Sequence, residues 1–346
     1  MTQKFSAAFR RKIAVFAPVL AFVTITTSVG CGAEDEGLGG ASAVTETVQS
    51  ELDSRPEGPA AEYVDTPVGR FHRSCVHEVP EAAEIDDTGN VQQGGRLLKR
   101  LERCRFKSFR GRRQPEKDLP PPTVNGWIAR LYAFAPITPA GYRWFNALTH
   151  TMKVPSNPTT RNGQLLYTFT SLLPLAGDAI IQPVLQWGIG PAGGGTKWGA
   201  AAWYVDNGRN FVTHSPLRDV VAGDSMVGQM AALSCTSAGV CRWAIAWSRN
   251  GQGLTSMVVQ TTNTFALADK AVLEAYNLTS CRQLPASGVL LFTNVKVFQP
   301  VTALDNMTEV TSSLNWASQK WNVTPNCNYG VIFPNPATGV ISFSAQ

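Results

Sequence analysis

From Trp127 onward, short stretches rich in apolar and β-branched residues alternate with glycine, proline, asparagine and aspartate. Such a pattern lacks helical periodicity and is typical of strands. The predicted strands are Gly126–Phe134, Asn146–Val154, Gln164–Leu172, Ala179–Gln186, Gly199–Val205, Arg209–Ser215, Ser225–Ser234, Trp243–Asn250, Leu254–Thr261, Lys270–Tyr276, Val289–Gln299 and Gly339–Ser344. Asn250-Gly251 predicts a hairpin turn, because both residues accept positive φ. Strands this numerous fit two packed antiparallel sheets, so the predicted fold class is an all-β, antiparallel β-sandwich over residues 126–346.

Composition limits both the size of the core and the class of partner. The chain has 346 residues, 44% hydrophobic and 16% charged, which is enough to bury a sizeable core. Its formal net charge is +5, but four of the cations lie among the first twelve residues, in a segment expected to be removed. The remaining charge is close to zero, which argues against nucleic acid as the main partner.

The N-terminus has the pattern of an export signal over residues 1–30. The basic cluster Arg10-Arg11-Lys12 precedes an apolar stretch from Ile13 to Val23. Ser28-Val29-Gly30-Cys31 then resembles a bacterial lipobox, which predicts lipidation of Cys31 and attachment to a membrane through that lipid. An ordinary cleaved signal and an uncleaved anchor are the alternatives, although the apolar run is short for a membrane span. The expected location is the cell envelope or outer surface, or the medium if the protein is secreted.

Residues 31–63 are poor in large apolar side chains and predict a flexible tether. Residues 64–118 form a small cysteine-containing basic segment, called the pre-segment below, in which nine of the eighteen residues from Arg96 to Arg113 are Lys or Arg. A solvated basic face, or a helix from Arg96 to Arg103, is one interpretation. An inhibitory or chaperoning pro-segment over an acidic cleft, cleaved near Arg110–Arg113, is the second, and contact with a membrane surface or nucleic acid is the third. Residues 119–125 form a proline-rich hinge.

Cysteine usage indicates an oxidising compartment, because setting Cys31 aside leaves six cysteines. Sequence neighbours favour the pairs Cys75–Cys104, Cys235–Cys241 and Cys281–Cys327. Without a tight Cys-x-x-Cys spacing and with four scattered histidines, a structural zinc site is not expected. Neither a metal nor an organic cofactor is predicted.

Two polar residues interrupt otherwise apolar strands, Gln186 in I-I-Q-P-V-L-Q-W-G and Glu274 in A-V-L-E-A-Y. A carboxylate and a carboxamide on one sheet face are enough to activate a water and stabilise an oxyanion. The plainer interpretation is that Glu274 lies on a wet face or pairs with Lys270, four residues earlier on the same side of the strand. Gln186 alone is more often a polar residue at a strand end.

Several motifs resemble those of the glutamic peptidases, or eqolisins, in the order of that family. They are Val154-Pro155-Ser156, Ile181–Gln186, Ala202-Trp203-Tyr204, Gly223–Met226, Val272–Tyr276 and Phe292-Thr293-Asn294. The resemblance implies a β-sandwich of the concanavalin-like or jelly-roll type. It also implies that Glu274 is the general base toward water and later the acid toward the leaving amine, with Gln186 binding the oxyanion.

The first functional hypothesis is therefore an exported, lipid-anchored, monomeric endopeptidase acting on extracellular proteins or peptides. Substrate-cleft candidates are Trp187, Trp203, Tyr204 and Tyr276. The second hypothesis is a non-catalytic, lectin-like module that holds a glycan or a peptide, because acidic residues of the family pattern are missing after Gln186 and Tyr204. A glycosidase ranks third, since it would need two carboxylates at a fixed separation.

Overall fold

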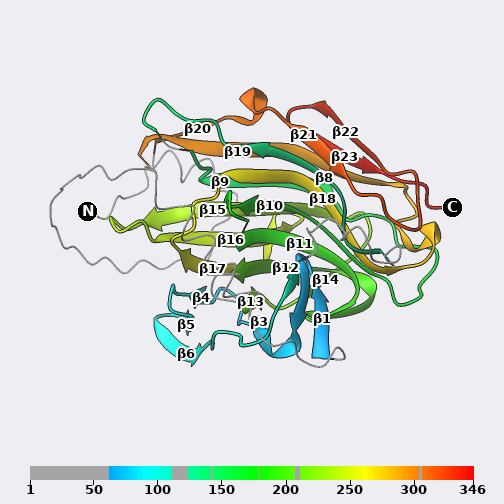
Figure 1. Ribbon diagram of the computed structural model, residues 1–346, viewed down its shortest axis with the longest axis horizontal. Coiled ribbons are helices and arrows are strands. Elements are labelled where there is room, and N and C mark those ends of the chain that lie inside the picture. The colour runs from blue at the N-terminus through cyan, green and yellow to red at the C-terminus, as the bar shows by residue number, and fades with distance from the viewer. Residues whose placement is uncertain (1–61, 111–123, 142, 178, 207–210, 304–305) are drawn as a thin grey trace.

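The computed structural model describes residues 62–110, 124–141, 143–177, 179–206, 211–303 and 306–346 (Figure 1). The predicted signal, the lipidation site Cys31 and the tether up to residue 61 lie outside these residues. So do residues 111–123, which include most of the predicted hinge. No helix in the described ranges is long and apolar enough to span a bilayer.

Two large sheets make up most of the described chain. The nine-stranded sheet has the order β21 (Ala317–Lys320), β8 (Val124–Phe134), β18 (Leu267–Leu278), β10 (Leu165–Leu173), β11 (Ala179–Gly190), β12 (Gly193–Asp206), β13 (Phe211–His214) and β3 (Val76–Glu78), with β14 (Arg218–Val220) also paired to β12. The eleven-stranded sheet has the order β22 (Gly330–Asn335), β23 (Thr338–Ser342), β19 (Val289–Ala303), β9 (Ala147–Lys153), β15 (Ser225–Cys235), β16 (Cys241–Arg249), β17 (Gln252–Thr261), β4 (Glu84–Ile85), β5 (Asn90–Gln93) and β6 (Arg96–Arg100), with β20 (Asn306–Glu309) paired to β19.

A small third sheet holds β1 (Tyr63–Thr66), β2 (Gly69–His72) and β7 (Phe109–Arg110). The helical turns in the described ranges are the short 3-10 turns η3 (Arg73–Cys75), η4 (Cys281–Gln283) and η5 (Thr311–Ser313). The predicted all-β class is confirmed, and each of the twelve strands expected from the sequence has a counterpart. Asn250 and Gly251 form the turn between β16 and β17 with φ of 51° and 83°, as their tolerance of positive φ predicts.

The main core fills the space between the two large sheets. Four tryptophans, each at most 1% exposed, belong to it: Trp187, Trp198, Trp243 and Trp247. Trp247 also donates from Nε1 to the carbonyl of Val184, 3.1 Å away on the facing sheet. A second apolar cluster covers the opposite face of the nine-stranded sheet, called the outer face below. This sheet is therefore buried on both sides, which explains why its central strands read as nearly continuous apolar runs.

Strands of the pre-segment pair with the edges of both large sheets (Figure 1). Its strand β3 pairs in parallel with β13, and its strand β4 pairs in parallel with β17. The helix considered for residues 96–103 is wrong, because Arg96–Arg100 is the exposed strand β6, paired with β5. Long, exposed basic side chains suit an edge strand, since they discourage pairing with another chain.

Three disulfides join Cys75 to Cys104, Cys235 to Cys241 and Cys281 to Cys327. These are the pairs that sequence proximity favours. The first lies wholly within the pre-segment and the other two lie wholly within residues 126–346. Bonds of this kind are typical of proteins that fold in an oxidising compartment.

Glu84 anchors β4 to the eleven-stranded sheet and makes this attachment sensitive to acid. Burial alone would raise the pKa of Glu84, but hydrogen bonds from Arg242 and Gln260 outweigh it and bring the pKa below its usual value of 4.5. A pKa that is lower in the folded state than in the unfolded state stabilises the fold above pH 4.5, and this stability is lost as the pH falls through the folded-state pKa.

We expect Glu84→Gln to lower the thermal unfolding midpoint at pH 7. The difference in midpoint between this variant and wild type should narrow toward pH 3. An equal gap at both pH values would contradict this.

Gly228 allows His150 to pack between the sheets. A Cβ at Gly228 would lie 2.2 Å from Cε1 of His150, whose ring is 1% exposed. We expect Gly228→Ala to cost about 1–3 kcal/mol of unfolding free energy through overpacking, measured by urea denaturation. The exposed Gly253, in the same sheet, has no atom near its Cβ position, so Gly253→Ala is the matched control and should change stability by less than about 0.5 kcal/mol.

Candidate active site

Gln186 and Glu274 lie in one row across three neighbouring strands. Tyr167 on β10 is directly opposite Gln186 on β11 and directly opposite Glu274 on β18. Residues paired across a sheet point to the same face, so all three side chains are on the outer face. At about 5 Å per pair, the two candidate residues have Cα atoms about 10 Å apart with one tyrosine between them. None of the three side chains is more than 1% exposed.

Glu274 is linked to a peptide carbonyl through one phenol. Its Oε1 lies 2.5 Å from the hydroxyl of Tyr276, two residues along the same strand face. The same hydroxyl donates to the carbonyl of Thr66 at 2.9 Å. A phenol has one proton, so it can donate to only one of the two oxygens at a time. The Tyr276 proton is therefore shared between two acceptors, Glu274 Oε1 and the Thr66 carbonyl.

Both tyrosines are neutral donors over the whole physiological pH range. Burial raises the pKa of Tyr276 well above 10, and the charge of Glu274 and its hydrogen bond raise it further. Burial likewise raises the pKa of Tyr167, with a further contribution from the charge of Glu274. Such donors can stabilise a developing oxyanion under acidic as well as neutral conditions.

The side-chain amide of Gln186 is used locally. Its Nε2 donates to the carbonyls of Gly188 at 3.0 Å and Gly193 at 2.8 Å, closing the turn between β11 and β12. The turn lies so close that a Cβ at Gly194 would be 2.8 Å from this nitrogen. Gln186 Oε1 is buried and has no hydrogen-bond partner among the described residues. The Gln186 amide thus donates to carbonyls of its own turn, whereas the carbonyls of the facing β1–β2 hairpin accept from other side chains.

The β1–β2 hairpin covers this row. Tyr167 donates to the carbonyl of Asp65 at 2.9 Å, and Gln182 Nε2 donates to the carbonyl of Pro67 at 3.1 Å. Val68 and Phe71 of the hairpin belong to the outer-face cluster, together with side chains from β8, β10, β11, β12, β13 and β18. The pre-segment therefore closes the site with its own backbone.

The cleft candidates divide between the two faces of the sheet. Trp203 and Tyr276 lie in the outer-face cluster, on the side of Glu274. Trp187 and Tyr204 pack in the core between the sheets, so the prediction that they line the same cleft is corrected. The reason is strand alternation, which turns Trp187 away from the face that its neighbour Gln186 occupies. Sequence reasoning missed Tyr167, whose place is set by pairing with two distant strands.

The ion pair between Lys270 and Glu274 that the sequence suggested is replaced by other contacts of Lys270. Its Nζ donates to the carbonyl of Pro336 at 3.1 Å and lies 4.3 Å from the ring centre of Trp316. The pairing of β18 with β8 is irregular between Asp269 and Ala271, which breaks simple alternation at this point. Burial lowers the pKa of Lys270 to about 8.

A second buried carboxyl lies further along β18. Asp269 accepts a hydrogen bond from Ser171 at 2.6 Å and lies 3.5 Å from Nη1 of Arg130. The Arg130 guanidinium is in turn 4.2 Å from the ring centre of Tyr132. Asp269 is thus part of an ion-paired network. The described residues contain no group of three or more His, Cys, Asp or Glu side chains that could hold a metal ion.

Comparison with solved structures finds seven matching chains, and glutamic peptidases are among them. No protein-family model and no curated protein matches the sequence. A crystal structure of Scytalido-glutamic peptidase with a peptide-based transition-state analogue is 12% identical, with a TM-score of 0.37 over 63% of this chain and 98% of that one. SCP-B, a member of the eqolisin family of peptidases, in complex with the tripeptide Ala-Ile-His, is 13% identical with a TM-score of 0.36 over the same shares.

Tyr276 is expected to stabilise the closed site through its hydroxyl. Tyr276→Phe removes the bond to Thr66 and the contact with Glu274, and we expect a loss of about 1–3 kcal/mol in unfolding free energy. Tyr132→Phe, at a half-buried position on the neighbouring β8, is the control and should cost clearly less. Equal losses in the two variants, measured by chemical denaturation, would show that the Tyr276 hydroxyl adds nothing specific.

Proposed function

We propose that this protein is a glutamic-type endopeptidase that hydrolyses peptide bonds on the outer face of its nine-stranded sheet. The observation that carries the proposal is the chain of contacts from Glu274 through Tyr276 to the Thr66 carbonyl. A buried carboxyl is separated from a peptide carbonyl by one neutral phenol, in a site that already accepts main chain. These are the parts that water-mediated amide hydrolysis needs.

In the proposed reaction, Glu274 in its ionised form takes a proton from a water that attacks the carbonyl carbon. The carbonyl electrons move to oxygen, and a tyrosine hydroxyl donates a hydrogen bond to the resulting oxyanion. The Tyr276 hydroxyl is the nearest such donor to Glu274, and Tyr167 is the next in the row. Collapse of the tetrahedral intermediate breaks the C–N bond, and Glu274 returns the proton to the leaving amine. Gln186 can join the oxyanion donors if its amide leaves the turn carbonyls.

The same proposal includes export and attachment to a membrane through lipidated Cys31. The three disulfides support an oxidising compartment. A protein with such a tether acts on extracellular proteins or peptides near the surface that holds it.

A non-catalytic peptide-binding module is the second candidate. It is favoured by one observation, that side chains of the outer face donate to three consecutive main-chain carbonyls, those of Asp65, Thr66 and Pro67. The glycan version of this candidate is less favoured. Trp187, Trp198, Trp243 and Trp247 pack in the core between the sheets and offer no stacking surface to a sugar.

Casein digestion between pH 3 and pH 7 tests the peptidase. We expect Glu274→Gln to lower the cleavage rate at least about 100-fold, because the amide cannot take a proton from water. The control is Glu309→Gln, at a position whose side chain is 44% exposed and which should keep wild-type activity. Equal rates in wild type and Glu274→Gln would refute the catalytic role. Absence of cleavage even after the pre-segment is displaced would favour the binding module.

A further inference from the structure

The contacts between the hairpin and the outer face are those of a bound peptide. Asp65, Thr66 and Pro67 present three consecutive carbonyls, and each accepts a hydrogen bond from a different side chain of the sheet: Tyr167, Tyr276 and Gln182. Because the donors address main-chain oxygens, they would serve other sequences of similar backbone shape. Val68, next along, is 7% exposed and packs into the apolar cluster beside them.

We propose that the turn Asp65–Val68 is an internal peptide ligand, and that it occupies the site by which this protein binds polypeptide in a turn conformation. The main-chain carbonyls of an incoming peptide accept hydrogen bonds from Tyr167, Tyr276 and Gln182. The apolar surface around Val68 binds a small β-branched side chain of that peptide. The turn must leave before any other peptide binds. This inference shares its cleft with the proposed function, but binding does not require that Glu274 be catalytic.

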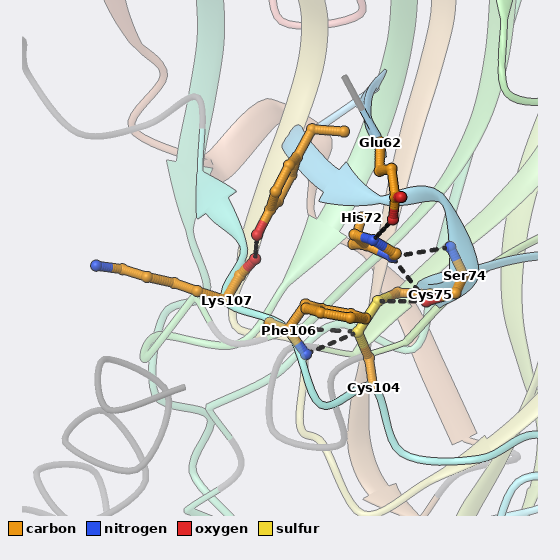
Figure 2. Close-up of polar contacts among 8 residues, drawn as sticks. Glu62, His72, Ser74, Cys75, Cys104, Phe106 and Lys107 are labelled. Carbon is orange, nitrogen blue, oxygen red and sulfur yellow. Dashed lines mark hydrogen bonds and ion pairs between the residues drawn. A yellow bond between two sulfur atoms is a disulfide. The ribbon is translucent and has the colours of Figure 1, made fainter. Parts of the chain in front are cut away.

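The hairpin is built as a unit that can move without unfolding. Figure 2 shows its base, where His72 lies between Glu62, at 2.5 Å, and Ser74, at 2.7 Å. The His72 ring also stacks on Phe106 with a centroid distance of 3.8 Å. Together with the Cys75–Cys104 disulfide, these contacts hold the hairpin to the rest of the pre-segment. The base of the hairpin is therefore ordered by contacts within the pre-segment, whereas Val68 and Phe71 pack on the sheet.

Apart from the polypeptide chain itself, the contacts that attach the pre-segment to the sandwich in the described residues are non-covalent. No disulfide there crosses from residues 62–110 to residues 124–346. The polar contacts include the short parallel pairings of β3 and β4, the Glu84–Arg242 pair, and hydrogen bonds from Ser256 to Glu81. Apolar side chains of the pre-segment also pack in the main core: Val79, Ala83, Ile85, Val91 and Leu101. Cutting the chain between residues 110 and 124 would leave these contacts as the restraint, so the internal ligand can be exchanged.

The test measures binding of a fluorescein-labelled peptide with the sequence of Val64–Phe71 to the full-length protein by fluorescence anisotropy. Val68→Asp places a charge in the apolar cluster and should displace the turn, so we expect this variant to bind the probe at least tenfold more tightly than wild type. Leu97→Asp makes the same kind of change at a 58% exposed position of the pre-segment and should bind like wild type. Adding Tyr276→Phe to Val68→Asp should weaken probe binding several-fold, whereas adding Tyr132→Phe should not.

Probe binding no tighter in folded Val68→Asp than in Leu97→Asp would overturn the inference. Folding is checked by near-ultraviolet circular dichroism and by the absence of free thiols among the six paired cysteines. If Val68→Asp does not fold, the wild-type protein provides the test through the rate of amide hydrogen exchange at residues 65–69. A saturating concentration of the probe should increase this rate, because the probe displaces the turn. An unchanged exchange rate would overturn the inference. Mass spectrometry of the same samples reports cleavage separately, so a bound but intact probe counts against the peptidase alone.

Discussion

The pairing of β10 with both β11 and β18 is the constraint on which the site depends. It aligns Gln186, Tyr167 and Glu274 in one row, although the outer two are far apart in sequence. A shift of one residue in either pairing would turn a side chain of the row into the core between the sheets. The inner face specifies this register, because its large aromatic side chains fill the core only when the strands are paired in this way.

Burial of the row has consequences for its chemistry. A carboxyl without exposure to water interacts strongly with the two tyrosines beside it, and their raised pKa values keep both hydroxyls protonated. The row is buried by the hairpin as well as by the sheet, since the hairpin carbonyls accept from Tyr167 in the row and from Tyr276 and Gln182 beside it. The closed site and the attached pre-segment are therefore one structural state, and opening it requires the edge contacts of β3 and β4 to give way or the hairpin to move.

Prediction from sequence succeeded where local pattern carries the information. Twelve strands and the Asn250-Gly251 turn follow from residue types within a few positions of each other. It failed where the partner is distant. Trp187 and Tyr204 were assigned to the cleft because they flank motif residues, but strand alternation places them in the inner core. The strand Arg96–Arg100 was missed for another reason: its signal is local, since Gly94-Gly95, with φ of 57° and 79°, forms the two-residue turn that pairs β6 with β5.

By itself, the sequence determined an all-β chain, its two unusual polar residues in apolar strands, and an even set of six cysteines besides Cys31. These properties depend on side-chain volume, polarity and short-range backbone preference. Only the tertiary structure decided that Tyr167 stands between Gln186 and Glu274, that Tyr276 connects Glu274 to a backbone carbonyl, and that the pre-segment supplies this carbonyl. Such relations arise from pairing between strands and from packing of a hairpin onto a sheet, and no stretch of sequence contains both partners.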